Sequence, residues 1–203
     1  AVAHRAAASN TAITKYAPVS AAGFLLKNEI EYFNKAMTNP SRPLVAIIGG
    51  AKVSDKIKLL ENIIDNVDCL LVGGGMAFTF LKADGFNVGK SICETDMLEL
   101  ARQIMAKAKA KNVRFLLPED TIIAQAPSAD AERNIVAIKD IPEGWMGLDI
   151  GPRTIAAFSE VVSKAKTVVW NGPLGMFEIA AFSSGTFKLV DAVVESGALS
   201  IVG

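Results

Sequence analysis

The chain has 203 residues, which is enough for one large domain or for one domain with part of a second. Hydrophobic residues make up 51% and charged residues 21%, a balance that permits a large buried core and excludes an intrinsically disordered chain. Since Lys+Arg and Asp+Glu both number 21, no net charge draws the protein to nucleic acid or to an anionic membrane, and we expect neither as a partner.

The first predicted element is a helix over residues 23–37, with an apolar stripe that includes Phe24, Leu25, Ile30, Phe33 and Met37. Two prolines in residues 38–43 stop this helix and mark the expected domain boundary. Beyond them, short apolar runs alternate with helical patterns. Strands are predicted at 44–48, 69–72 and 114–117, and helices at 53–66, 76–83 and 95–109, the last with Thr95 as a candidate N-cap.

The alternation continues in the second half of the chain. Two short strands are predicted around Ile122 and Val136, with a polar turn between them. There follow a helix at 154–164 introduced by Pro152, a strand at 167–170, a helix at 184–194 and a strand at 199–202. This order predicts a doubly wound α/β fold, with a mostly parallel, Rossmann-like sheet and helices on both faces.

Glycines follow four of the predicted strands, at Gly49-Gly50, Gly73-Gly74-Gly75, Asn171-Gly172-Pro173-Leu174-Gly175 and Gly203. Each alone is equally well explained as a tight turn. The carboxyl ends of parallel strands share one rim, however, where ligands bind in open α/β sheets, and glycine allows a ligand to approach the backbone closely. Together the loops favour a nucleotide or phosphate site, although neither a G-x-x-x-x-G-K-[ST] loop nor a strand-linked G-x-G-x-x-G is present.

Two lysines, Lys52 and Lys56, lie four residues apart at the predicted start of the second helix, and therefore on one face. The helix dipole disfavours cations there by up to about 1 kcal/mol each. One interpretation is that both are solvated and that one pairs with Asp55. The glycine loops next to them favour the other, in which the lysines stabilise the charge of a polyphosphate.

Four ordered motifs resemble those of phosphoglycerate kinase, and the resemblance covers essentially the whole chain. They are GGAKVSDK at 49–56, GGGMAFTF at 73–80, GWMGLDIGP at 144–152 and WNGPLGMFE at 170–178, and Ala3-His4-Arg5 also matches. The family is a two-domain glycolytic kinase that transfers a phosphoryl group between 1,3-bisphosphoglycerate and ADP, with Mg²⁺ on the nucleotide. By this resemblance, residues 1–37 are a remnant of the N-terminal domain with the interdomain helix, and residues 38–203 are a truncated, nucleotide-binding C-terminal domain.

The resemblance also implies roles for single residues. Lys52 would contact the transferring phosphoryl group and Lys56 the nucleotide phosphates. The adenine pocket would be lined by Gly50, Gly75, Gly147 and Leu148. The phosphates and ribose would lie beside Asn171, Gly172 and Pro173, and the ribose hydroxyls would donate to Glu178. Arg5 would belong to the basic patch that holds 3-phosphoglycerate, and no metal ligand is identified in the chain.

Three departures from the family qualify this assignment. The chain is about half the family's length, it stops at the first glycine of a Gly-Gly-Asp loop that would reach the phosphates and the metal, and Ala1 and Ala7 stand where many members have Gly and His. The absence of an initiator Met and of a signal peptide adds to the expectation of an internal segment that is incomplete at both ends. We therefore expect these 203 residues alone to bind ADP or ATP with little turnover.

Alternatives of other classes are a non-catalytic ADP/ATP-binding module and a dinucleotide-dependent oxidoreductase, which would need a G-x-G-x-x-G loop. A scaffold role would leave the two lysines unexplained. Cys69 and Cys93 have no metal-like spacing and favour a reducing compartment. We expect a cytoplasmic monomer, while a plastid form without its transit peptide would look the same.

Overall fold

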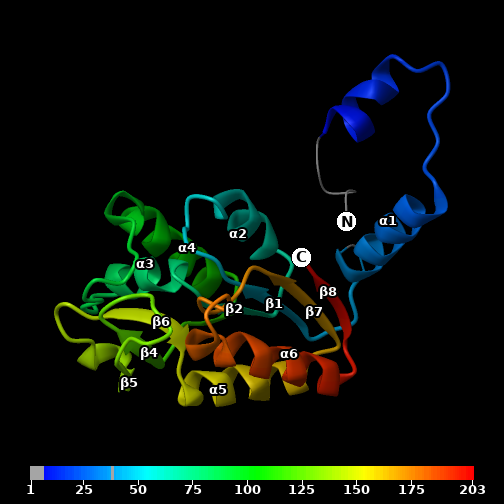
Figure 1. The fold of residues 1–203 in the computed structure, drawn as a ribbon. Coiled ribbons are helices and arrows are strands. Elements are labelled where there is room, and N and C mark those ends of the chain that lie inside the picture. The colour runs from blue at the N-terminus through cyan, green and yellow to red at the C-terminus, as the bar shows by residue number, and fades with distance from the viewer. Residues whose placement is uncertain (1–6, 38) are drawn as a thin grey trace.

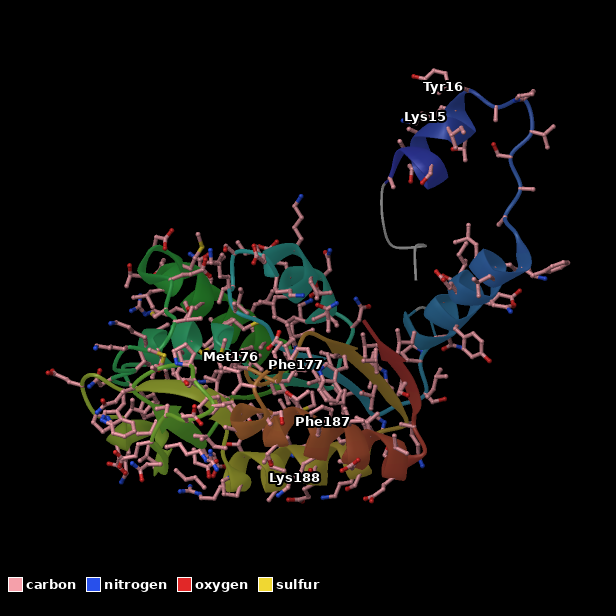
Figure 2. The ribbon with its side chains drawn as sticks, viewed as in Figure 1. Lys15, Tyr16, Met176, Phe177, Phe187 and Lys188 are labelled. Carbon is pink, nitrogen blue, oxygen red and sulfur yellow. The ribbon has the colours of Figure 1, made fainter. Side chains whose placement is uncertain are left out.

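The computed structural model describes residues 7–37 and 39–203. An N-terminal segment, with a π-helical turn (Ala8–Ala12, η1), a 3-10 turn (Ile13–Lys15, η2) and helix α1 (Phe24–Met37), stands apart from a layered domain (Figure 1). Lys15 and Tyr16 lie on this segment, and Tyr16 is 86% exposed (Figure 2). Helix α1 projects away from the domain, and only its C-terminal end lies close to β7 and β8 (Figure 1).

A five-stranded sheet forms the centre of the domain. Its strands are β1 (Leu44–Ile48), β2 (Cys69–Val72), β3 (Arg114–Leu116), β7 (Thr167–Asn171) and β8 (Leu199–Val202). They lie in the order β3-β2-β1-β7-β8 and every pair is parallel. The apolar runs of β1 and β2 are buried at every position, as strands covered on both faces should be.

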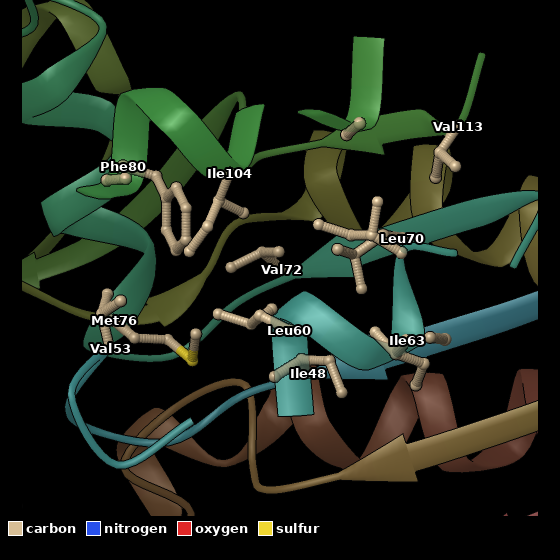
Figure 3. Close-up of a cluster of buried hydrophobic side chains, with 14 of the residues drawn as sticks. Ile48, Val53, Leu60, Ile63, Leu70, Val72, Met76, Phe80, Ile104 and Val113 are labelled. Carbon is tan, nitrogen blue, oxygen red and sulfur yellow. The ribbon is translucent and has the colours of Figure 1, made fainter. Parts of the chain in front are cut away.

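Helices cover both faces of this sheet, so the predicted doubly wound α/β fold is confirmed (Figure 1). Helices α2 (Ile57–Ile63), α3 (Met76–Ala83) and α4 (Leu98–Ala110) lie on one face, and α5 (Pro152–Ser163) and α6 (Ser184–Ser196) on the other. Alternate residues of one strand serve the two cores. Ile48 packs with Leu60, Val72 and Phe80 (Figure 3), whereas Ile47 packs with Phe158 on the opposite side.

A second, antiparallel sheet of three strands extends the domain. Its order is β5 (Arg133–Ala137), β4 (Asp120–Ala124), β6 (Met146–Ile150). The 3-10 turn Ile138–Asp140 (η4) lies in the connection from β5 to β6. The strands predicted around Ile122 and Val136 are thus confirmed, but β6 was not predicted. A small core beneath the sheet joins it to α3 through Phe78 and Leu81.

The start of α2 differs from the prediction. The helix begins at Ile57 and not at Val53, so Lys56 is its N-cap residue and Lys52 lies outside it. The expectation that both lysines occupy the first helical turn is therefore wrong. Val53 is fully buried and the Ser54 hydroxyl is tied to Glu94, contacts that hold this stretch as a turn.

One other helix start also differs from the prediction. The helix predicted at 95–109 starts as a 3-10 turn (Thr95–Met97, η3), and Thr95 makes no capping bond. The 3-10 turn Ala180–Phe182 (η5) precedes α6.

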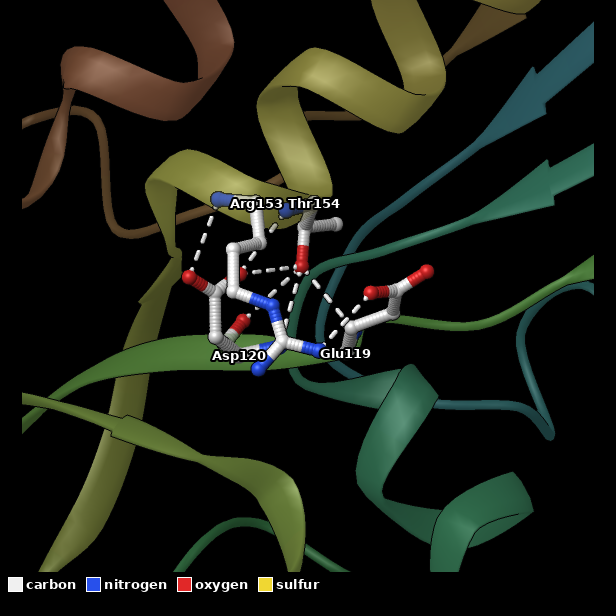
Figure 4. A network of polar contacts seen from close by, with 4 residues as sticks. All are labelled: Glu119, Asp120, Arg153 and Thr154. Atoms are coloured by element: carbon white, nitrogen blue, oxygen red, sulfur yellow. Dashed lines mark hydrogen bonds and ion pairs between the residues drawn. The ribbon is translucent and has the colours of Figure 1, made fainter.

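Helix α5 is capped by a buried aspartate from another element. Asp120, 2% exposed at the start of β4, accepts bonds from the backbone N–H groups of Arg153 (3.0 Å) and Thr154 (2.8 Å) and from the Thr154 hydroxyl (2.6 Å) (Figure 4). Gly151 must be a glycine here, because a Cβ would overlap the Asp120 carboxylate. The small sheet is thereby fixed to the amino end of α5.

Candidate functional site

A cavity of about 410 Å³ lies where the carboxyl ends of β1, β2 and β7 meet the small sheet. This is the edge at which open α/β sheets bind ligands, and the volume falls in the range of small-molecule sites. The cavity is lined by Gly50, Ala51, Gly74, Gly75, Phe78, Ile92, Pro118, Thr121, Met176, Glu178 and residues 147–150 and 173–175.

The glycine loops at this edge are interlocked. Gly49 N–H donates to Asn171 O (2.9 Å), Gly50 N–H to Pro173 O (2.9 Å) and Gly74 N–H to Leu174 O (3.0 Å). A Cβ at Gly49 would overlap the Pro173 carbonyl. These N–H groups therefore bond the loops to one another and are not free to bind a ligand. The glycines allow three backbones to approach closely.

Lys56 reaches across from the β1 loop to the β7 loop, where its Nζ donates to Asn171 Oδ1. Gly50 lies beside this pair, since a Cβ built on it would be 3.7 Å from Lys56 Cε. Asn171 is a neutral partner, so the contact leaves the ammonium charge uncompensated. Lys52 is an exposed side chain on the same loop, next to the cavity-lining Ala51.

Part of the cavity wall is apolar, and this part is called the apolar slot below. Phe78, Ile92, Leu148 and Met176 contribute its hydrophobic surface. Gly147 forms part of the wall, and a Cβ there would overlap the Phe78 ring. An apolar slot next to cationic groups suits a planar ring that carries phosphates.

Asp149 closes the floor of the cavity and is 3% exposed. Its carboxylate accepts bonds from the backbone N–H of Gly185 (2.7 Å), in the first turn of α6, and from its own neighbour Ile150 (2.9 Å). Burial raises the pKa of Asp149 to about 6, although both hydrogen bonds oppose the rise. The carboxylate caps α6 from inside the domain, as Asp120 caps α5.

Comparison with known proteins agrees with this geometry. The family model described as phosphoglycerate kinase matches residues 1–203. The chain belongs to the phosphoglycerate kinase family. It is 57% identical to the phosphoglycerate kinases of Geotalea uraniireducens and Citrifermentans bemidjiense over 203 residues, which is 100% of this chain and 51% of each relative.

Solved phosphoglycerate kinases share the fold. The structure from Coxiella burnetii has a TM-score of 0.93 and 49% identity, and covers 100% of this chain and 52% of that one. The Pyrococcus horikoshii structure has a TM-score of 0.81 and 28% identity, with 99% of this chain and 51% of that one covered. The chain thus spans about half the length of the relatives it matches.

Most of the residues assigned from the phosphoglycerate kinase motifs gather around the cavity. Six of them line it: Gly50, Gly75, Gly147, Leu148, Pro173 and Glu178. Lys56 and Asn171 contact each other at its edge, and Lys52 is on the adjoining loop. Gly172 lines a smaller apolar cavity of about 190 Å³, with Trp170 and Phe177. Arg5 lies outside the described residues.

Sequence reasoning missed several residues of the cavity, notably Phe78, Ile92, Thr121, Asp149 and Met176. The apolar ones carried no signal, because side chains of the same kind fill the core. Asp149 did carry one: it is a lone acid between Leu148 and Ile150, which indicates a buried carboxylate with a specific partner.

In residues 7–37 and 39–203, no group of three or more His, Cys, Asp or Glu side chains lies together so that it could hold a metal ion. Within the same residues, no helix combines the length and the hydropathy that a bilayer crossing requires.

Proposed function

We propose that this chain carries the nucleotide site of a phosphoglycerate kinase. The full protein would transfer a phosphoryl group reversibly from 1,3-bisphosphoglycerate to ADP, giving 3-phosphoglycerate and ATP in glycolysis. The observation that carries the proposal is a cavity with an apolar slot in its wall and, beside its lining residue Gly50, a lysine whose printed partner is the neutral amide of Asn171. Family membership agrees with it.

The apolar slot fits an adenine ring. Phe78 and Leu148 offer hydrophobic surface, and Gly75 and Gly147 line the cavity without adding side chains to it. Glu178, at the rim of the same cavity, would accept hydrogen bonds from the ribose hydroxyls. The base would thus be bound mainly by apolar contact and the sugar by a carboxylate.

The lysines would act on the phosphates. Lys56 would exchange or share its bond to Asn171 with a phosphate oxygen, while Lys52 would contact the transferring phosphoryl group. Asn171, Gly172 and Pro173 would hold the loop beside the phosphates and ribose. Phosphoryl transfer depends on positioning and charge neutralisation, so no nucleophilic side chain is required.

Mg²⁺ would enter with the nucleotide, held by its phosphate oxygens, and would neutralise charge on the transferred group. The cavity provides one carboxylate at its rim, Glu178, and one buried in its floor, Asp149, and neither belongs to a cluster of acids in the described residues. Phosphate oxygens would supply part of the coordination, and the resemblance implies a further protein ligand, the aspartate of the Gly-Gly-Asp loop.

The rest of the assignment concerns the two substrates and the division of the chain. We propose that residues 1–37 belong to the N-terminal domain and interdomain helix, with Arg5 in the 3-phosphoglycerate patch, and that residues 38–203 form the nucleotide domain. The protein would work as a cytoplasmic monomer. The 203 residues alone would bind nucleotide with little turnover, since they carry one of the two substrate sites.

Calorimetric titration of the 203-residue chain with ADP, ATP, adenosine and NAD tests the proposal. We expect ADP and ATP to bind more tightly than adenosine, because the lysines act on phosphate, and NAD not to bind specifically. Tighter binding of NAD, or equal binding of ADP and adenosine, would contradict the proposal. Nucleotide binding without phosphoglycerate-dependent turnover in the full-length protein would instead identify a non-catalytic binding module.

A further inference from the structure

Glu94 holds the loop that carries Lys52, from a distance of 40 residues along the chain. Its carboxylate accepts the Ser54 hydroxyl at 2.6 Å through Oε1 and the Ser54 backbone N–H at 3.1 Å through Oε2. Both oxygens therefore bind one residue of the β1–α2 loop, a bidentate contact that fixes orientation as well as distance.

Glu94 is itself fixed to the wall of the cavity. Its backbone N–H donates to the hydroxyl of Thr79 (3.1 Å), a fully buried residue of α3. Ile92, two residues earlier, lines the cavity. The carboxylate thus joins a rigid helix and the cavity wall to a loop that is otherwise exposed at Ala51, Lys52, Ser54 and Asp55.

The charges around this contact are arranged favourably. Partial burial would raise the pKa of Glu94, but hydrogen bonds from Ser54 and from the Val53 backbone, together with the nearby charge of Lys52, outweigh it and lower the pKa. Glu94 is therefore a carboxylate at neutral pH. Lys52 is not among the described ion pairs, whose charged atoms lie within 4.0 Å, so its ammonium is left for another anion.

We propose that Glu94 is a positioning residue for phosphoryl transfer, which holds the Ala51–Lys56 loop so that Lys52 faces the nucleotide phosphates. Lys52 lies between Gly50, whose backbone is hydrogen-bonded to Pro173 and Met76, and Ser54, which is bound by Glu94. Without the second anchor, the backbone of Lys52 is held from one side only. This inference rests on the proposed nucleotide site and identifies the residue that orients its cation.

A double-mutant cycle on the 203-residue chain tests the inference, with Glu94→Ala, Lys52→Ala and the double variant. The measured quantity is the ratio of the dissociation constants of adenosine and ATP, which isolates the contribution of the phosphates. We expect each single variant to lower this ratio about tenfold, and Glu94→Ala to have less than about a twofold effect once Lys52 is already Ala. Adenosine binding should be unchanged throughout.

Additive losses in the cycle, or a parallel loss of adenosine binding, would show that Glu94 acts only on stability and would overturn the inference. Glu94→Gln retains an acceptor for the Ser54 hydroxyl and should restore most of the ratio. If Glu94 acted merely as a negative charge, both substitutions would strengthen ATP binding, which would also overturn the inference.

The matched control is Glu99→Ala, because Glu99 is an exposed glutamate that is bonded within α4. Failure of the unmodified chain to prefer ATP over adenosine would refute the proposed function itself, and the inference with it.

Discussion

The two sides of the candidate site are held together by opposite means. On the side of the small sheet, α5 and α6 begin at buried carboxylates, Asp120 and Asp149, which satisfy their N–H groups from inside the protein. On the side of the glycine loops, α2 has Lys56 as its N-cap residue, with no acidic residue in its first turn and no side-chain cap. One side carries its own anions, and the other presents cations.

The difference indicates where the ligand belongs. A helix end that is capped by a buried carboxylate has no need of an external anion. Lys56, at an uncapped helix start and with an amide as its partner, would be stabilised by an added anion. Substitutions on the carboxylate side should therefore change stability, and substitutions on the lysine side should change nucleotide affinity.

Asp120→Ala should have the largest effect of all. It leaves three donors of α5 without their acceptor in a buried site, so we expect the free energy of unfolding to fall by about 4 kcal/mol. Urea denaturation measures it. Glu119→Ala, which removes an exposed ion pair to Arg153, is the neighbouring control and should cost less than about 0.5 kcal/mol. Equal losses for the two variants would mean that the cap is not a major source of stability.

The pH dependence of the free energy of unfolding should include a contribution from the protonation of Asp149. Burial raises the pKa of its carboxyl to about 6 in the folded protein, so between about pH 4 and pH 6 the folded state binds more protons than the unfolded state. The free energy of unfolding should fall by up to about 3 kcal/mol as the pH rises through this window, and then level off.

Urea denaturation of the chain and of Asp149→Asn at several pH values separates this contribution from that of the other acids. The part of the change in free energy of unfolding with pH that is lost in Asp149→Asn is the contribution of Asp149. Asp140→Asn, at an exposed aspartate, should leave the profile unchanged. Identical profiles for the chain and Asp149→Asn would show that Asp149 does not titrate in this range.

The comparison also explains what could be predicted from the sequence. The strands at 44–48 and 69–72 were predicted with their observed bounds, because short continuous apolar runs that end at glycines signal strands buried on both faces. Strand β6 was missed, since its Gly147 and Asp149 are unfavourable in strands and make sense only beside Phe78 and α6.

The same limit applies to the site. Glycines and lysines at the ends of strands were visible in the sequence, whereas Glu94 was not, because its partner Ser54 is 40 residues away. Because of that contact, α2 also starts later than the helix that the apolar periodicity predicts. Val53 fits the helical pattern but packs as part of a turn. Local pattern located the loops, and long-range contacts determined their conformation.

Gly147→Ala tests whether the base binds in the apolar slot, where β6 of the small sheet meets the glycine loops. The added Cβ would overlap Phe78, a buried residue of the small core, and would narrow the apolar slot. We expect adenosine and ATP affinity to fall together by about 100-fold, or about 2.7 kcal/mol, as measured by calorimetry. Gly23→Ala, where a Cβ meets nothing within 4 Å, is the control. Unchanged adenosine binding would place the base elsewhere.

Lys56→Ala should have the smallest effect and the most selective one. Its ammonium is bonded to a neutral amide, so its removal costs little stability but takes away a charge that would otherwise bind phosphate. We expect ATP affinity to fall about tenfold, or about 1.4 kcal/mol, with adenosine affinity unchanged. Lys58→Ala, on the exposed face of the same helix, should change neither. If the two lysine variants behaved alike, the local positive charge would matter and not the position of Lys56. A loss confined to Lys56→Ala would mean that the position of its ammonium beside the cavity determines phosphate binding.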